Sequence, residues 1–316
     1  MKKFVIAGLL IVSSNTFAVT FFTIGTGGVT GSYFPMGTVI CRWLNTQTHE
    51  TNLHCNVQTG GSVTNINNLK TEKIAFGFAQ SDVIYQAYHG TKRFEGQPYP
   101  NLRSIMAIYP EMMALVVDKR AGIKTLTDIK GKKINVGNLG SGHEVTTRDI
   151  FQEVGLLQAD LKLASHFKDE ACPSALNNQL IEGYFYMGGH PTANIRMAAN
   201  LTKIDLIPIS GNAIDNMIAK YPYYIKGVIP SQLYQGINED IPSIGVKAVL
   251  VTSVNASNKE VRLILKTVLD NFAYLKHIHP LLRQRAVTKE NLLEGLSVPL
   301  HPAAHKYYQE VGLLKE

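Results

Sequence analysis

The chain has 316 residues, of which 45% are hydrophobic, and a formal net charge of +7 at pH 7. This length is enough for two domains of ordinary size, and the composition is that of a globular protein rather than a disordered chain. The basic residues form no dense run interleaved with aromatic residues, which argues against a nucleic-acid partner, whereas a mildly basic field favours anionic ligands.

The first residues have the pattern of an export signal. Lys2 and Lys3 precede an uninterrupted apolar run over residues 4–12, and small residues lead to Ala18. This pattern is typical of a secretory signal peptide over residues 1–18 with cleavage after Ala18. The apolar run is too short for a membrane anchor, and no later stretch is long enough to span a bilayer. We therefore expect a periplasmic protein that is not itself embedded in the membrane.

The stretch 21–33, FFTIGTGGVTGSY, predicts a strand, a glycine- and hydroxyl-rich turn, and the start of a helix. Polar turns of the same kind follow at residues 59–62, 80–82 and 137–142. Free N–H groups in the first turn of a helix, together with the helix dipole, attract anions. Repeated polar turns at strand ends predict a ligand cleft.

Apolar periodicity predicts an alternation of strands and helices over the first part of the chain. The expected helices cover residues 34–44, the segment that Ser62 caps, and 83–89, and the expected strands after the opening one cover 53–58 and 74–79. Such strand–helix units favour a parallel sheet covered by helices.

The middle of the chain predicts a second α/β unit. The expected strands are 102–109, 113–117, 134–136, 161–167, 183–187 and 204–209, and the expected helices are 123–133, the segment after the loop 137–142, 172–181, 192–199 and 212–220.

The last part of the chain predicts a connector and then a return to the first unit. Residues 221–242 lack periodicity; a strand at 247–252, a long helix at 258–278 and terminal helices at 291–293 and 303–311 follow. A chain that crosses twice between two units leaves a hinge and a cleft between them.

The three cysteines are Cys41, Cys55 and Cys172. An exported protein can form disulfides, and Cys41 and Cys55 are close enough in sequence to pair. The alternative is that all three are small buried hydrophobic residues. No C-x-x-C pair is present, so no metal site is predicted.

The motifs of nucleotide-binding enzymes and hydrolases are missing or incomplete. Position 30 is Thr, so the opening loop does not complete G-x-G-x-x-G, and neither G-x-x-x-x-G-K-[ST] nor G-x-S-x-G occurs. No cofactor and no enzymatic activity are predicted, and turnover of an ester, amide or phosphate would revive the hydrolase hypothesis.

Several segments, taken in order, match those of a known family: GTGGVTGSYFPMG, TGGSVTNINNL, FGFAQSDV, LTDIKGKKINVG with its GSG loop, GGHPTANIR and PLHPAAHKYYQE. Together they resemble the TAXI family, the solute-binding proteins of tripartite ATP-independent periplasmic (TRAP) transporters. The resemblance covers nearly the whole chain after the signal peptide. It implies a type II periplasmic-binding-protein fold, in which two α/β lobes close on a ligand. It also implies delivery of a small organic anion, such as glutamate, glutamine or a 2-oxoglutarate-like dicarboxylate, to the TRAP membrane subunits.

On this resemblance, residues 19–110 and 243–316 form the first lobe and residues 111–242 form the second. The family pattern also implies a set of ligand-binding residues from both lobes. These are Thr26, Gly27, Thr30, Tyr33, Ser62, Gln80 and Ser81 in the first lobe, and Ser141, Gly142, His143, Gly188 and His190 in the second.

Three positions have alternative interpretations. Tyr33 is either a ligand contact or a packing tyrosine with a paired hydroxyl, and His190 before Pro191 is either a ligand contact or a structural residue of the turn. His143 departs from the small residue usual in the family; it either pairs with a ligand carboxylate, shrinks the pocket or points outward. Glu144 would repel an anion if it faced inward.

Two functions follow from this pattern. The first is a binding protein without catalysis, in which the ligand biases an equilibrium between open and closed forms. The second is a periplasmic interaction or surface immunogenic protein without a transport ligand, which predicts a cleft filled by side chains.

Overall fold

The computed structural model describes residues 18–278, 280–283 and 287–315. The predicted signal peptide lies outside the described residues except for Ala18. The described strands are β1 (Thr20–Gly25), β2 (Leu53–Gln58), β3 (Phe76–Gln80), β4 (Leu102–Asp118), β5 (Lys133–Asn135), β6 (Leu163–Ser165), β7 (Gly183–Gly188), β8 (Ile204–Ile207), β9 (Ile225–Ile229) and β10 (Ile241–Ser253). The described α-helices are α1 (Tyr33–Asn45), α2 (Thr48–Thr51), α3 (Ser62–Lys70), α4 (Ser81–His89), α5 (Gly142–Val154), α6 (Cys172–Asn177), α7 (Ala193–Leu201), α8 (Asn212–Lys220), α9 (Asn258–Asp270), α10 (Phe272–Ile278) and α11 (Pro302–Glu310).

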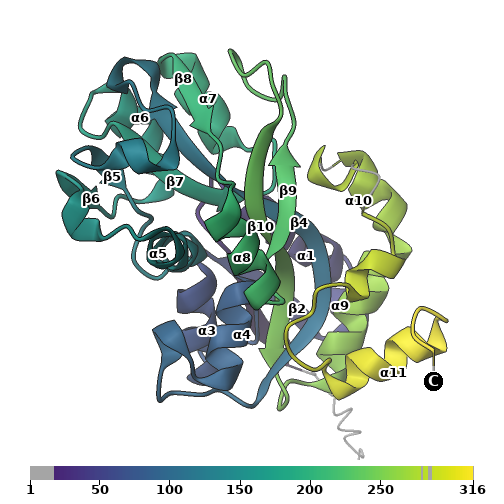
Figure 1. Ribbon diagram of the computed structural model, residues 1–316. Helices are drawn as coiled ribbons and strands as arrows, with labels where there is room; N and C mark the ends of the chain where they lie inside the picture. The colour runs from purple at the N-terminus through teal and green to yellow at the C-terminus, as the bar shows by residue number, and fades with distance from the viewer. Residues whose placement is uncertain (1–17, 279, 284–286, 316) are drawn as a thin grey trace, which may run out of the picture.

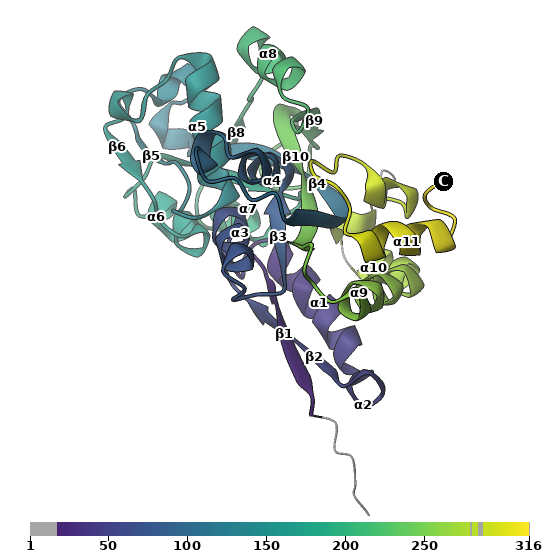
Figure 2. The ribbon, with the colours of Figure 1, turned by 90° about the horizontal axis from the view of Figure 1, so that it is seen from below.

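The strands join in one sheet in the order β2-β1-β3-β10-β4-β7-β5-β6, with β8 beside β4 and β9 beside β10. Strands β1, β2 and β3 pair in parallel at one end, and β5, β6 and β7 pair in parallel at the other. Between them, β4 and β10 are antiparallel to their neighbours. Two parallel α/β parts therefore meet at a pair of long antiparallel strands, and Figures 1 and 2 show helices packed around both parts.

Strands β4 and β10 run through two separate hydrophobic clusters. In β4, Ile105 packs in a first core with Ile24 and Met36, whereas Leu115 packs in a second core with Ile150 and Phe185. In β10, residue 250 belongs to the first core and residue 246 to the second. Each of the two long strands thus connects both cores.

The prediction of separate strands at 102–109 and 113–117 is wrong. Pro110 interrupts the apolar pattern, but it lies opposite Lys247 in the antiparallel register, and the pairing with β10 continues on both sides of it. The segment 221–242, predicted as a connector, contains β9, which pairs with the first half of β10. Pairing with a neighbouring strand, which no local pattern reveals, decides both cases.

Some predicted helices are shorter than expected. The segment 123–133 forms only a 3₁₀ turn at Leu126–Ile129, and α6 ends at Asn177. The long helix predicted at 258–278 divides into α9 and α10 at Asn271, whose amide donates to the carbonyl of Thr267. Side chains of Asn and Asp compete for backbone groups and so favour helix ends.

The C-terminal helices pack beside the first helix. Val261 of α9 and Tyr307 of α11 share the first core with Met36 of α1. Figure 1 shows α9, α10 and α11 together along one side of the molecule. The end of the chain therefore completes the core that its beginning starts.

Cys41 and Cys55 form a disulfide that ties α1 to β2, with their Cα atoms 4.9 Å apart. Both residues are buried in the first core. Cys172 in α6 is a buried free thiol. Of the two alternatives for the cysteines, pairing thus holds for the first two and simple burial for the third.

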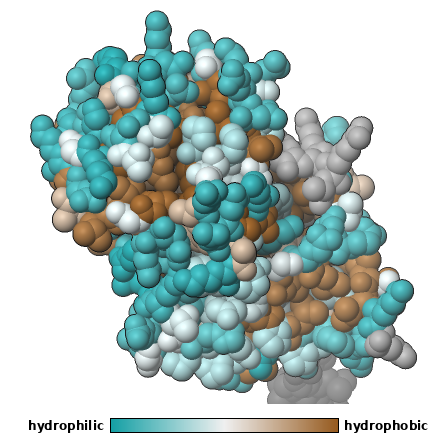
Figure 3. Space-filling model, in the orientation of Figure 1, coloured by the Kyte–Doolittle hydropathy of each residue, from teal (hydrophilic) through white to brown (hydrophobic). Residues whose placement is uncertain are grey.

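The visible surface is mainly polar. Figure 3 shows hydrophilic residues over most of one face, with hydrophobic residues in the hollows between elements. Among the described residues, no helix has both the length and the apolar character required to cross a membrane.

Candidate functional site

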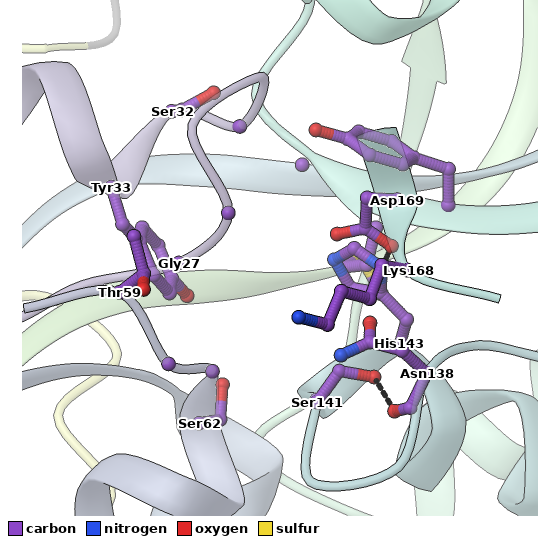
Figure 4. A pocket seen from close by; sticks show the side chains of 18 of the residues that line it. Gly27, Ser32, Tyr33, Thr59, Ser62, Asn138, Ser141, His143, Lys168 and Asp169 are labelled. Atoms are coloured by element: carbon purple, nitrogen blue, oxygen red, sulfur yellow. Dashed lines mark hydrogen bonds and ion pairs between the residues drawn. The ribbon is translucent and has the colours of Figure 1, made fainter. Parts of the chain in front are cut away.

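A pocket of about 470 Å³ lies at the strand ends between the two parallel parts of the sheet. It is lined by residues 27–29, 31–33, 59–62, 80, 111, 138–139, 141–143, 168–170 and 186–188. In Figure 4 the labelled residues Tyr33 and Ser62 face His143 and Ser141 across the space, with Lys168 reaching into it. The polar turns that the sequence singles out thus meet at one cavity.

Three helices begin at this pocket. Tyr33, Ser62 and Gly142 are the first residues of α1, α3 and α5, and all three line it. The first N–H groups of a helix lack partners within the helix, and the helix dipole places partial positive charge there. Three such ends around one cavity make it a suitable place for a negatively charged group.

Eight of the twelve predicted ligand-binding residues lie on the pocket wall. They are Gly27, Tyr33, Ser62, Gln80, Ser141, Gly142, His143 and Gly188. Gly142 lies close to the end of β3: a Cβ at this position would lie 2.0 Å from Oε1 of Gln80, so a larger residue would displace that side chain. The position of Gly142 therefore lets α5 begin in contact with the end of β3.

Thr26 and Thr30 do not line the pocket. Thr26 is fully buried, and its hydroxyl donates to the carbonyl of Gln58 over 2.8 Å, which ties β1 to β2. Thr30 lies on an outer groove, where its carbonyl accepts a hydrogen bond from Thr192. The Thr26 side chain and the Thr30 main chain thus hold the opening loop in place, and neither residue lines the cavity.

Ser81 and His190 are also away from the pocket. The Ser81 hydroxyl donates to the carbonyl of Tyr223 and accepts from the N–H of Lys247. The His190 ring is buried between the Tyr234 hydroxyl and the carbonyl of Met112, and burial lowers its pKa to about 4. His190 is therefore neutral near pH 7, and its contacts match the structural interpretation of this residue.

His143 faces inward and is held by a carboxylate. Its Nδ1 lies 3.3 Å from Oδ1 of Asp169, and both side chains are largely buried. Burial by itself would lower the pKa of His143, but the nearby carboxylates of Asp169 and Glu111 outweigh it and raise the pKa above its ordinary value. The protonated form of His143 is thus favoured by the carboxylates beside it. Glu144 does not line the pocket; it is buried and pairs with Arg148.

The pocket also holds charged residues that the sequence analysis missed: Glu111, Lys168, Asp169 and Glu170. Residues 168–170 form a charged run after a strand, which in most proteins is a solvated loop. Glu111 follows Pro110 inside a long apolar stretch, and this lone carboxyl was the signal that could have revealed it.

Glu111 is only 3% exposed, and its Oε2 accepts a hydrogen bond of 2.6 Å from the Tyr33 hydroxyl. Burial raises the pKa of Glu111 to about 7, although the bond from Tyr33 and the charge of His143 act against this rise. Burial, followed by the charge of Glu111, raises the pKa of Tyr33 well above its usual value. Tyr33 is therefore a neutral donor whose hydroxyl is already paired.

Segments from the two sides touch around the pocket. The Val29 N–H donates to Oε1 of Glu170 over 3.1 Å, and the Thr64 N–H donates to the carbonyl of Gly140 over 3.1 Å. The pocket is therefore bridged on two sides. Among the described residues, no group of three or more His, Cys, Asp or Glu side chains is arranged to hold a metal ion.

This architecture is that of a known class. The mixed sheet, with two long strands joining two α/β parts and a pocket at the strand ends, is the type II periplasmic solute-binding-protein fold, as the sequence predicted. Residues 24–312 match the NMT1-like family, so the chain belongs to that family.

Solved structures share the fold at low sequence identity. A substrate-binding protein of an ABC uptake transporter from Streptococcus pneumoniae, with bound histidine, has 14% identity and a TM-score of 0.51, over 85% of this chain and 95% of that one. A protein from Bordetella bronchiseptica RB50 has 14% identity and a TM-score of 0.53, over 92% of this chain and 82% of that one. The arginine-, lysine-, histidine-binding protein ArtJ from Geobacillus stearothermophilus has 13% identity and a TM-score of 0.50, over 85% of this chain and 97% of that one.

Proposed function

We propose that this protein is the extracytoplasmic solute-binding subunit of a TRAP transporter, which captures a small organic anion in the periplasm and delivers it to the membrane subunits. The observation that carries this proposal is the convergence of three helix N-termini on one polar pocket. The motifs that resemble the TAXI family support the transporter class. On this proposal the protein binds its ligand without chemical change.

The proposed ligand is a compact carboxylate such as glutamate, glutamine or 2-oxoglutarate. A pocket of about 470 Å³ has room for a small molecule. Main-chain N–H groups near Ser62 and Gly142 are suitable donors to carboxylate oxygens. The Ser141 hydroxyl already donates to the carbonyl of Asn138. The Gln80 amide already donates to Asp82 and Thr146, so Gln80 offers its oxygen as an acceptor. The solute-binding proteins of similar fold from S. pneumoniae and G. stearothermophilus bind amino acids, which are of similar size.

The two cores mark the proposed lobes, with the predicted boundaries at residues 19–110, 111–242 and 243–316, although residues 244 and 246 of β10 pack in the second core. Strands β4 and β10 pass through both cores and would act as the hinge. Bridges such as Val29 to Glu170 would form when the lobes close. A ligand held by both lobes favours the closed form through its contacts to each.

The function is tested by calorimetry of the exported form with a panel of dicarboxylates and amino acids. Trp43 on α1 is the single tryptophan and lies outside the pocket, so a change in its fluorescence would report a rearrangement of the first core on binding. We expect saturable binding of at least one small carboxylate. If no member of the panel binds, the proposal loses its basis.

The alternative of a surface protein without a ligand predicts a cleft filled by side chains. The pocket is not filled by side chains and is lined by polar groups from both sides, which favours the binding function instead. Mass spectrometry of small molecules that co-purify with the protein would also discriminate between the two, because the alternative predicts none.

A further inference from the structure

Three carboxyl groups line the pocket, and their partners differ. Asp169 faces the ring of His143, and Glu170 accepts the N–H of Val29. Glu111 accepts a hydrogen bond from the hydroxyl of Tyr33 and forms no ion pair among the described residues. Of the three, Glu111 is thus the one bonded to a hydroxyl, with neither an ion pair nor a bond from a main-chain N–H among the described residues.

The groups around Glu111 come from several elements. Tyr33 lies on α1, Tyr109 on the same strand, Tyr186 on β7 and His143 on α5, and Asp82 acts on it from the start of α4. His143 favours ionisation of Glu111, whereas Asp82 opposes it. Burial outweighs both, so the pKa of Glu111 rises to about 7. Near neutral pH its charge can therefore be removed at little cost in free energy.

An ionised Glu111 conflicts with the rest of the pocket. The helix ends, His143 and Lys168 make the cavity favourable for an anion, yet a buried carboxylate on the wall would repel it. A protonated carboxyl would instead supply an O–H donor, while its other oxygen keeps the bond from Tyr33.

We infer that Glu111 takes up a proton from solvent when an anionic ligand binds, and that its carboxyl group then donates a hydrogen bond to that ligand. The inference rests on the proposed function and assigns Glu111 as a residue that sets ligand specificity. A ligand that presents a carboxylate or carbonyl oxygen to Glu111 is accepted, and one that presents a cation there would require the ionised form.

The direction of the pH effect follows from linkage. An anion beside Glu111 raises its pKa further, so the complex holds a proton that the free protein loses above about pH 7. Affinity therefore falls as the pH rises above that value, at most about tenfold per pH unit. Below it, Glu111 is already protonated and adds no pH dependence.

The test measures protons directly. Calorimetry of 2-oxoglutarate binding near pH 7.5, in two buffers of different ionisation enthalpy, gives the number of protons taken up. Both carboxylates of 2-oxoglutarate are ionised and it has no amine, so any proton must come to the protein. We expect uptake of up to about three-quarters of a proton per ligand for the unaltered protein at this pH, because the rest of Glu111 is already protonated.

Glu111→Gln keeps the size and a donor but cannot titrate. We expect it to bind 2-oxoglutarate at pH 8 more tightly than the unaltered protein does, to take up no proton and to show a flat pH profile. Glu153→Gln, on α5 outside the pocket, is the matched control and should behave as the unaltered protein.

Binding without proton uptake by the unaltered protein, or uptake that persists in Glu111→Gln, would overturn the inference and leave the proposed function intact. Proton release on binding would also overturn it, because it means that the bound anion makes the protein lose a proton rather than gain one. Failure of every carboxylate in the panel to bind contradicts the proposed function instead. The measurement on the unaltered protein decides the inference even if Glu111→Gln does not fold.

Discussion

Asp82 is fully buried where β3 meets α4, and it accepts hydrogen bonds from the hydroxyl of Thr146 and the N–H of Val83. Burial raises its pKa from 3.8 to about 6, and the nearby Asp149 adds to the rise although these hydrogen bonds oppose it. The folded protein therefore holds the proton of Asp82 more tightly than the unfolded chain does. Asp82 therefore makes its whole contribution to the free energy of unfolding below about pH 4. This contribution is lost as the pH rises through about 6.

We expect Asp82→Asn to change the pH dependence of stability. Relative to the unaltered protein, its free energy of unfolding should rise by about 3 kcal/mol between pH 4 and pH 7, because the variant no longer ionises. Urea unfolding at both pH values measures this difference. Hydrogen bonds lost in Asp82→Asn lower its stability by the same amount at both pH values and so do not affect this comparison. If the stability difference between the variant and the unaltered protein is the same at pH 4 and pH 7, the prediction is wrong.

His143 should contribute its charge to anion binding. We expect His143→Asn to weaken 2-oxoglutarate binding by roughly tenfold or more, because a charge-assisted contact is lost and Asp169 is left without its partner. His305→Asn, at an exposed position on α11, is the control. Equal affinities for the two variants in calorimetry would show that His143 does not contact the ligand.

At the scale of elements, α5 contacts the beginning of α4 through hydroxyl groups. The Thr146 hydroxyl donates to Asp82 over 2.6 Å and accepts from Gln80 over 2.9 Å. The neighbouring Thr147 is equally buried, but its hydroxyl has no hydrogen-bond partner among the described residues. Thr147 is therefore a matched control for Thr146: both are buried on α5, but within the described part of the chain only the Thr146 hydroxyl is hydrogen-bonded.

We expect Thr146→Val to lower the free energy of unfolding by about 1 to 3 kcal/mol, because it removes one hydrogen bond from each of the buried side chains Gln80 and Asp82. Thr147→Val should change it by less than about 0.5 kcal/mol or raise it. Urea unfolding at neutral pH compares the two. Equal losses would mean that the side-chain shape, and not the hydrogen bonds, causes the effect.

The link between α1 and β2 gives a second prediction at this scale. The disulfide Cys41–Cys55 closes a loop with a sequence separation of 14. Closing a loop of this length reduces the conformational entropy of the unfolded chain, so loss of the disulfide should lower the free energy of unfolding by about 3 kcal/mol. Thermal or urea unfolding with and without a reductant measures it. Cys172→Ala should keep the full effect of the reductant, and a Cys41→Ala, Cys55→Ala double variant should show none.

For the whole molecule, the contacts across the pocket indicate a closed arrangement. The Val29 N–H donates to Glu170, and the Thr64 N–H donates to the carbonyl of Gly140. Behind them, Asp149 of α5 accepts a hydrogen bond from Gln86 of α4 and lies 3.0 Å from Lys92 in the turn after α4. Strands β4 and β10 contribute to both cores, so under the proposed function the rest of each proposed lobe would move as a body about them.

We therefore expect the ligand to shift the protein toward the compact form. Small-angle scattering should show a smaller radius of gyration with saturating 2-oxoglutarate, approaching about 19 Å for a compact chain of this length. A carboxylate that does not bind in calorimetry is the control. Binding without any change in radius would contradict closure about β4 and β10.

The local parts of the fold could be predicted because they depend on nearby residues. Strand β2 and helix α1 follow from apolar spacing, and the polar turns before α3 and α5 follow from glycine and serine at strand ends. The position of Pro110 inside a continuous strand could not, since its neighbour Lys247 is far along the chain.

The residues of the site also divide into those that nearby sequence predicts and those that only distant contacts decide. The sequence by itself determined which turns are polar, glycine-rich and able to open a helix, because these properties belong to single residues and their neighbours. Only the tertiary structure decided that Ser81 and His190 turn to buried partners while Glu111 joins His143 on the pocket wall. The physical reason is that burial and charge at these positions are set by segments more than thirty residues away, which packing alone brings together.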